Sequence, residues 1–218
     1  MGKQVAAGSN RQSAAERDDD RQLMALVVHK DRTAFEQLYK RYYHRVFQFA
    51  YRMVKDHGVV EEIVDDTMFA VWKSAASFQG KSAVSTWIFG IAYRRALKTL
   101  EKGRKHQAMS GDNEQIYAEP DMHPTADPAA AAQARDLHRQ LQQGIDHLSS
   151  DHKAVMMLTG MGYSYGEISE IVDCPENTVK TRMFHALKYL KNHLSDSALG
   201  ALSNPEQKNL WTQNTPIS

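Results

Sequence analysis

Four carboxylates lie close together in the first half of the chain, with no lysine or arginine among them. Side chains four residues apart project from the same side of a helix, and like charges at that spacing cost roughly 0.2–0.5 kcal/mol per pair. Such a cluster can be a solvated face, a metal site or a surface that binds a basic partner protein. Di-metal carboxylate sites in helical bundles need Glu-x-x-His pairs, which this segment lacks. We favour a docking surface and keep a solvated face as the alternative; the residues are Glu61, Glu62, Asp65 and Asp66.

A second group of charges is basic and follows a run of aromatic side chains. Cations favour the C-terminal end of a helix, but the six between Arg94 and Lys105 exceed that need and indicate contacts with phosphates. Aromatic rings beside a basic surface suit single-stranded nucleic acid, in which each stacked base contributes about 1–3 kcal/mol. Rings at helical spacing are usually core, so we expect Trp87 to be partly buried and keep both roles open for Phe89 and Tyr93. The candidate residues are Phe78, Lys81, Ser82, Trp87, Phe89, Tyr93, Arg94, Arg95 and Lys98.

The sharpest local pattern is a short helix, a tight turn and a longer basic helix. Ser164 and Glu167 have the spacing of a capping box, which marks the start of the short helix. Pro175 ends it, because a proline disfavours helix in the residue before it and can itself open the next helix. A helix-turn-helix places its second helix in the major groove, although an ordinary helical bundle can show the same pattern. The residues expected to face DNA are Glu176, Asn177, Thr178, Lys180, Thr181, Arg182, His185 and Lys188.

Apolar side chains recur at helical intervals on both sides of a polar stretch, which predicts an all-α chain of two small helical domains. Four helices are expected in residues 18–106 and four more in 130–195. A flexible acidic linker with several Gly and Pro residues joins them over 107–129. Residues 1–17 are expected to be a disordered arm and 196–218 a frayed C-terminal tail.

Two local signals predict backbone details. A helix is expected to begin near Asp31 or Thr33, and Thr33 with Glu36 has capping-box spacing. Asp173 is expected in the turn that ends the short helix.

The composition excludes several classes of protein. The chain has 218 residues, a formal net charge of +1 and a single cysteine, Cys174, which excludes an internal disulfide and fits a reducing cytoplasm. Apolar runs are shorter than the roughly 18–20 residues of a membrane span, so we expect no membrane insertion. The ten histidines show no His-Glu-x-x-His or comparable spacing. We therefore expect no metal, no cofactor and no catalytic residue.

Together these segments resemble the sigma-70 family of bacterial RNA polymerase sigma factors, specifically its extracytoplasmic-function (ECF) group. The resemblance runs from about Asp20 to Lys105 and again from about Leu137 to Leu194. Residues 61–72 are similar to the family segment AEDLVQETFLRAW and residues 85–92 to TWLYRIA. Residues 178–183, TVKTRM, look like the TVKSRL that starts the family's recognition helix.

The chain departs from the family pattern at several positions. Tyr93-Arg94 stand where the family usually has Arg-Asn, so an asparagine contact cannot be carried over. Ser149-Ser150 replace a usual Pro-Pro pair, which is expected to change only capping. Asp173 replaces the usual turn glycine, and aspartate tolerates the left-handed conformation better than most residues. Phe184 and Leu187 stand where basic residues are common, which implies fewer phosphate contacts or a different promoter.

The resemblance implies an alternative sigma factor that binds core RNA polymerase and directs promoter recognition, DNA melting and transcription initiation. The acidic helix would bind the clamp helices of the largest subunit, and the second domain would lie near the polymerase flap. The first, sigma domain 2-like part would capture the −10 element and the second, sigma domain 4-like part the −35 element of promoter DNA. The acidic linker would pass through the RNA-exit path. The resemblance also implies an anti-sigma factor that occludes both domains.

Two other functions stay open at this point. A stand-alone transcription regulator would use the helix-turn-helix, but such proteins normally dimerise on paired half-sites, and the acidic helix would have no role. A helical enzyme such as a metal hydrolase would need ligand spacing that the histidines do not show.

Overall fold

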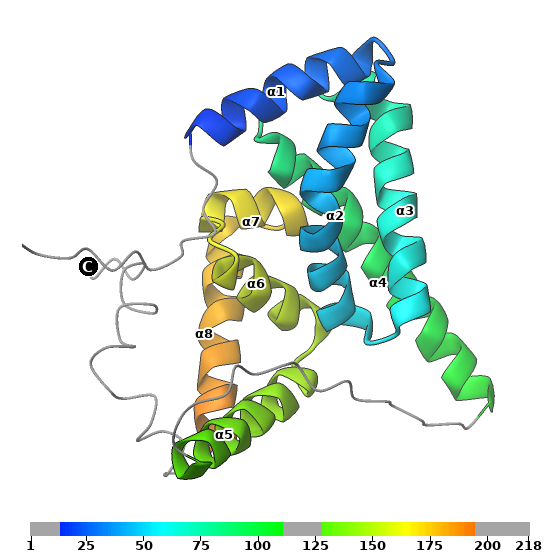
Figure 1. The fold of residues 1–218 in the computed structure, drawn as a ribbon. Helices are drawn as coiled ribbons and strands as arrows, with labels where there is room; N and C mark the ends of the chain where they lie inside the picture. Colours follow the sequence, from blue (N-terminus) through cyan, green and yellow to red (C-terminus); the bar gives the residue numbers. More distant parts are fainter. Residues whose placement is uncertain (1–13, 111–127, 195–218) are drawn as a thin grey trace, which may run out of the picture.

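The computed structural model describes residues 14–110 and 128–194, which form eight α-helices and one short 3₁₀ helix, with no strand among the described residues (Figure 1). The first domain contains α1 (Ala14–Val28), α2 (Arg32–Val54), α3 (His57–Ser74), η1 (Ala75–Ser77) and α4 (Val84–Ser110). The second domain contains α5 (Pro128–Asp146), α6 (Ser150–Gly160), α7 (Tyr165–Val172) and α8 (Glu176–His193). This arrangement confirms the all-α fold class predicted from the apolar periodicity.

The helix ends differ by a few residues from the expected boundaries. Helix α1 begins at Ala14, inside the stretch expected to be an arm, and α4 continues to Ser110. Helix α5 begins at Pro128, because a proline is favoured at the first helical position, where its missing N–H costs nothing. The remaining expectations, for the arm before residue 14, the middle of the linker and the tail, fall outside the described residues.

The cap of α2 is Asp31, and the capping box expected at Thr33 and Glu36 does not form. The Asp31 carboxylate accepts a hydrogen bond from the backbone N–H of Ala34 at 2.9 Å. Thr33 therefore lies inside the first turn, and the Glu36 carboxylate binds Lys40 one turn later, at 2.6 Å. Asp31 has the extended backbone of an N-cap residue, whereas Thr33 already has a helical backbone, so Asp31 caps the helix.

The signals in the second domain predict the local backbone correctly. The Ser164 hydroxyl accepts from the Glu167 N–H while the Glu167 carboxylate accepts from the Ser164 N–H, so the capping box forms. Asp173 ends α7 in the left-handed conformation, with φ 51° and ψ 55°. Ser149 caps α6. The left-handed backbone of Asp173 turns the chain from the end of α7 toward α8.

The first domain is built around the apolar sides of α2, α3 and α4. Val46, Phe49, Val64 and Ile88 are fully buried there, and each such side chain contributes about 1.5–3 kcal/mol. The buried Asp20 carboxylate ties α1 to α2 by accepting hydrogen bonds from Tyr42 and Arg41. This framework holds α3 and α4 with one face each toward the surface.

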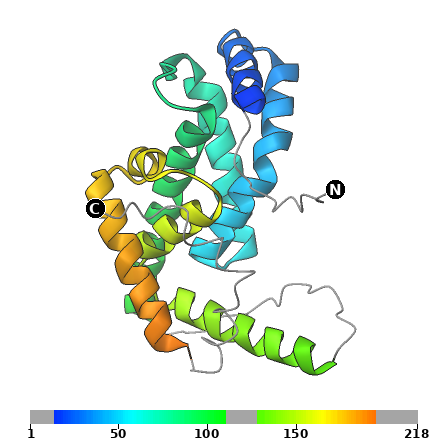
Figure 2. The same ribbon diagram turned by 90° about the vertical axis from the view of Figure 1, so that its left-hand side faces the viewer.

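The second domain packs directly against the first. Helix α7 contacts α4 and α6 contacts α2, so one apolar core continues through both domains (Figure 1). In the side view α5, in green, lies beside the C-terminal end of α8 (Figure 2). Gly144 permits this approach, since a Cβ there would lie 2.7 Å from Leu190 Cδ2. Among residues 14–110 and 128–194, no helix combines the length and apolarity of a membrane span.

Candidate polymerase and nucleic-acid interfaces

Helix α3 presents the predicted carboxylates on its exposed side. Its opposite side, including Val60, Ile63 and Val64, is buried in the core of the first domain. Because the buried positions recur every three or four residues, the acidic ones between them must face outward. The residues found exposed are Glu61, Glu62, Asp65 and Asp66. We call these four residues the acidic face.

Three of the four carboxylates have a partner within the chain. Asp65 accepts a hydrogen bond from the Tyr39 phenol at 3.0 Å, and burial together with this carboxylate raises the pKa of Tyr39 to about 12. The Asp66 carboxylate lies 2.5 Å from the Arg95 guanidinium, although its side chain is 65% exposed. The Glu61 carboxylate lies 3.6 Å from His57. These contacts are at the surface, so the face keeps most of its negative charge toward solvent.

Phe69 belongs to the same surface and is absent from the predicted set. Its side chain is 60% exposed, and the ammonium of Lys73 lies 5.8 Å from the centre of its ring. Phe69 follows Asp65 by four residues, so it stands one turn farther along the acidic face. That spacing could have identified it, because a large apolar side chain on a charged face costs solubility unless something binds it.

The loop before α4 brings two of the predicted base-binding aromatic residues together. The rings of Phe78 and Trp87 lie 5.4 Å apart, and both side chains are half-buried against the core. Lys81 is exposed beside them in sequence, and Ser82 is partly exposed. The partial burial of Trp87 agrees with the expectation that it is partly core.

Phe89 and Tyr93 are covered by the second domain. The ring of Phe89 is fully buried between Phe49, at 5.5 Å, and Tyr163, at 5.3 Å between ring centres. Tyr93 is 4% exposed, and its phenol donates to the Asp151 carboxylate at 3.1 Å. Burial, with the charge of Asp151, raises the pKa of Tyr93. In this closed arrangement neither ring can meet a base.

The basic residues of α4 remain at the surface. Arg94 and Lys98 are exposed, whereas Arg95 is partly buried in its ion pair with Asp66. The structure therefore brings Arg94 and Lys98 to one solvent-facing side, while Arg95 links the basic surface to the acidic face.

Helix α8 presents its predicted DNA-facing side to solvent. Val179, Met183 and Ala186 are buried against the second domain. The Lys180 ammonium lies 2.9 Å from Glu176 within the helix, and both side chains are nearly half exposed. The other exposed members of the predicted set are Asn177, Thr181, His185 and Lys188, with Thr178 partly exposed.

Arg182 differs from the rest of that set because its guanidinium is already paired. It donates to Asp151 at 2.6 Å and lies 3.6 Å from the Cys174 sulfur. Phe184, by contrast, is 62% exposed and its ring lies 5.6 Å from that of His185. Apolar groups in the major groove can contact thymine methyl groups, so Phe184 is a further candidate on this face.

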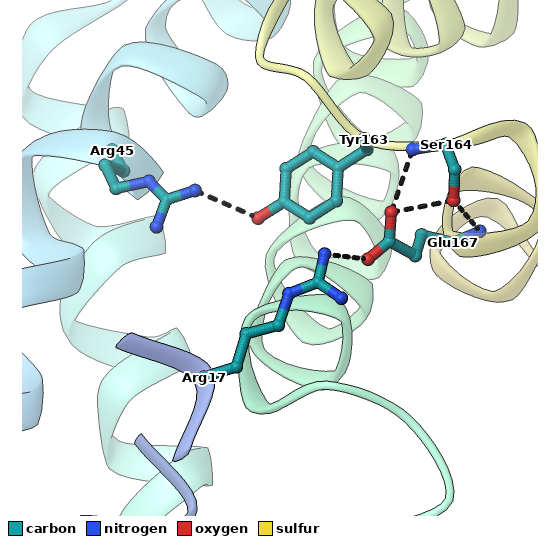
Figure 3. A network of polar contacts seen from close by, with 5 residues as sticks. All are labelled: Arg17, Arg45, Tyr163, Ser164 and Glu167. Atoms are coloured by element: carbon teal, nitrogen blue, oxygen red, sulfur yellow. Dashed lines mark hydrogen bonds and ion pairs between the residues drawn. The ribbon is translucent and has the colours of Figure 1, made fainter. Parts of the chain in front are cut away.

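A polar network crosses the boundary between the domains (Figure 3). The Arg45 guanidinium of α2 donates to the Tyr163 phenol at 3.3 Å. The Arg17 guanidinium of α1 lies 2.9 Å from Glu167, the same carboxylate that closes the capping box of α7. Within residues 14–110 and 128–194, no cluster of three His, Cys, Asp or Glu side chains could hold a metal ion.

The two halves of the chain match two family models. Residues 38–106 match sigma-70 region 2 and residues 138–190 match sigma-70 region 4. The ECF RNA polymerase sigma-E factor of Escherichia coli is 31% identical over 79% of this chain and 93% of its own length. The sigma-E factor of Haemophilus influenzae is 29% identical over 83% of this chain and 97% of its own.

Two solved structures share the fold. The sigma factor RpoE of Bartonella quintana, in complex with the anti-sigma factor NepR, has a TM-score of 0.59 and 23% identity, and covers 73% of this chain and 95% of its own. CnrH, in complex with the cytosolic domain of CnrY, has a TM-score of 0.57 and 20% identity, over 80% of this chain and 96% of its own. The chain contains an acidic helix, a basic helix beside aromatic residues and a helix-turn-helix, in the order of the matched regions. It therefore belongs to the sigma-70 family, as an ECF-type alternative sigma factor that directs transcription initiation.

Proposed function

We propose that the acidic face of α3 binds the clamp helices of the largest subunit of core RNA polymerase. The observation that carries this proposal is that four carboxylates lie exposed on one side of a helix whose other side is core. Repulsion between like charges at this spacing lowers the stability of the helix, and binding to a basic partner would offset that repulsion. Phe69 supports it by adding an exposed apolar group that a partner can bury.

Charge reversal at Glu61 and Glu62 tests this docking surface. These two are better targets than Asp65 and Asp66, whose partners Tyr39 and Arg95 would be left unpaired. The contact that Glu61 loses, to His57, is longer, and both of its side chains are exposed. The variant Glu61→Lys/Glu62→Lys should bind core polymerase roughly tenfold or more weakly, since complementary charges become repulsive. Glu170→Lys, an exposed reversal on α7, serves as the control and should bind as wild type. Unchanged binding of the α3 variant would refute the assignment.

We further propose that α4 and the loop before it capture the unpaired −10 strand. Phe78 and Trp87 supply rings for stacking, Lys81 and Ser82 line the loop, and Arg94, Arg95 and Lys98 would hold the backbone. Phe89 and Tyr93 join this surface only after the second domain has moved away. The binding energy of the open strand then drives melting, so no catalytic residue is needed and the chain acts as a regulatory subunit.

For the second domain we propose that α8 enters the major groove of the −35 element. Asn177 can read adenine, and Lys180, His185 and Lys188 can contact guanine edges or phosphates. The remaining members of this surface are Glu176, Thr178, Thr181 and Arg182. Selection of duplexes from a random library by the holoenzyme would show an enriched −35 sequence that shifts in an Asn177→Ala variant. An unaltered preference would exclude Asn177 from base reading.

Other partners follow from the family and the solved complexes. Bartonella RpoE was solved in complex with the anti-sigma factor NepR, and CnrH in complex with the cytosolic domain of CnrY. We propose an anti-sigma factor for this chain as well. We also propose that the second domain contacts the polymerase flap, and that the protein acts in the cytoplasm, where polymerase and promoter DNA are found. Co-purification from cells that express the tagged chain would identify these partners.

A further inference from the structure

Among the described residues, the contacts that hold the two domains together involve none of the acidic face. Three basic residues of the first domain each contact a side chain of the second domain: Arg17, Arg45 and Lys55. The Lys55 ammonium lies 3.2 Å from the carboxylate of Asp146, which is also 3.8 Å from Lys153. Both Asp146 carboxylate oxygens are buried without a hydrogen bond. Charge attraction from the two lysines is therefore what compensates the burial of Asp146.

The centre of the boundary is aromatic. Tyr163 is 6% exposed, and its ring packs on Phe89 while its phenol accepts from Arg45. The Arg45 guanidinium also lies 5.8 Å from the centre of the Phe89 ring. Burial raises the pKa of Tyr163 to about 12, so the phenol stays protonated at any physiological pH. The second domain thus occupies the face of α4 that a base would need.

We propose that the free chain closes on itself in an autoinhibited state, in which α7 and Tyr163 cover the base-binding face of α4 without any partner protein. The consequence for DNA rests on the proposed function of that face, whereas the closure itself does not. The partly exposed Arg17–Glu167 pair holds only weakly. Polymerase favours the open chain when it binds that state more tightly, and the proposed contact of the second domain with the flap would supply this difference in affinity. The acidic face stays accessible in the closed state, and docking can therefore precede opening.

The test loosens the boundary without touching either DNA-binding surface. Arg17→Ala removes the pair with Glu167, and Lys55→Asn removes the pair with Asp146. Asparagine suits position 55 because Lys55 has a φ of 63°, a conformation that asparagine tolerates. The control variant Arg21→Ala/Arg52→Ala also removes two positive charges, but from exposed positions on α1 and α2.

A buried thiol reports on opening. Gly90 is buried on α4, and a Cβ there would meet Arg94 at 3.5 Å and the Ile171 carbonyl of α7 at 3.8 Å, which are ordinary contacts. A Gly90→Cys reporter, in a Cys174→Ser background, would react with a thiol reagent only when α7 lifts. Losing the partly exposed Arg17–Glu167 pair shifts the closed–open equilibrium by up to about fivefold. Losing Lys55 beside the buried Asp146 carboxylate shifts it further, so the reaction rate should rise at least about twofold in the double variant. Circular dichroism checks that each variant is folded.

Small-angle X-ray scattering of the free, full chain without the reporter gives an independent readout. We expect a compact particle for wild type and the control, and a larger radius of gyration for Arg17→Ala/Lys55→Asn. An extended wild-type particle, or a thiol that reacts equally fast in all three backgrounds, would overturn the proposal. Neither measurement contains polymerase or DNA, so such a result would leave the proposed function untouched.

Discussion

The phenol of Tyr93 on α4 donates a hydrogen bond to the Asp151 carboxylate on α6, with 3.1 Å between Oη and Oδ1. The second oxygen of that carboxylate accepts from Arg182 on α8, at 2.6 Å. One carboxylate thus joins a residue of the expected −10 surface to a residue of the expected −35 surface. The contribution of the Asp151 carboxylate to folding stability can be measured separately from DNA binding.

A double-mutant cycle over Arg182→Ala and Asp151→Ala should show that these side chains stabilise the second domain together. Both are partly exposed, so we expect a coupling of about 0.5–1 kcal/mol in the free energy of unfolding. Urea denaturation followed by circular dichroism measures it. If the coupling is zero and Arg182→Ala weakens −35 binding alone, Arg182 is a DNA contact rather than a structural one.

The cap of α2 predicts different costs for two neighbouring substitutions. Asp31→Ala removes the side chain that accepts the Ala34 N–H and should lower the free energy of unfolding by about 0.5–2 kcal/mol. Thr33→Ala, inside the helix and exposed, should be neutral or slightly stabilising, because alanine is the better helix former. Equal losses for the two variants would contradict the assignment of Asp31 as the cap.

The second domain should lose stability in mild acid through His152. Burial lowers the pKa of His152, helped by the charges of Arg182 and His185 and opposed by that of Asp151. The unfolded chain therefore binds a proton more readily than the folded one, and stability falls as pH drops below the unfolded pKa of about 6.5. His152→Gln should reduce the decline in unfolding free energy between about pH 7.5 and 5.5. An identical decline in both proteins would exclude this origin.

Lys180 should contribute to −35 affinity through a phosphate or a base edge. Its side chain is 44% exposed on the open side of α8. If the contact is a phosphate, Lys180→Ala should weaken binding to all duplexes alike and reduce the slope of log affinity against log salt by about 1. Lys191→Ala, exposed in the last turn of α8, is the matched control. The same slope in wild type and Lys180→Ala would show that no phosphate contact was lost.

Local patterns were sufficient to predict the helices, the acidic face and the turn before α8. The 3.6-residue period fixes which side of α3 is buried, and therefore that Glu62 is exposed. The capping box of Ser164 lies within four residues, so it can be read without knowing the fold. The N-cap of α2 was harder to predict, because Asp31 and Thr33 can both cap a helix and lie only two residues apart.

Contacts between distant segments could not be predicted in the same way. Periodicity shows that Phe89 lies on an apolar side of α4, but not that Tyr163 of the second domain packs on it. Arg182 looks like a DNA contact from its position on α8, and only the fold places Asp151 beside it. The sequence therefore predicts which residues can bind, whereas the structure shows which of them are covered in the closed state.

Transcription by the purified chain with sigma-free core RNA polymerase on a library of bacterial genomic fragments is the most direct measurement. The wild-type chain should start RNA at a discrete set of sites that share −35 and −10 sequences, and Glu61→Lys/Glu62→Lys should start few or none. Glu170→Lys should match wild type. A wild-type chain that binds core polymerase yet starts no RNA from any fragment would contradict its assignment as a promoter-recognising sigma factor.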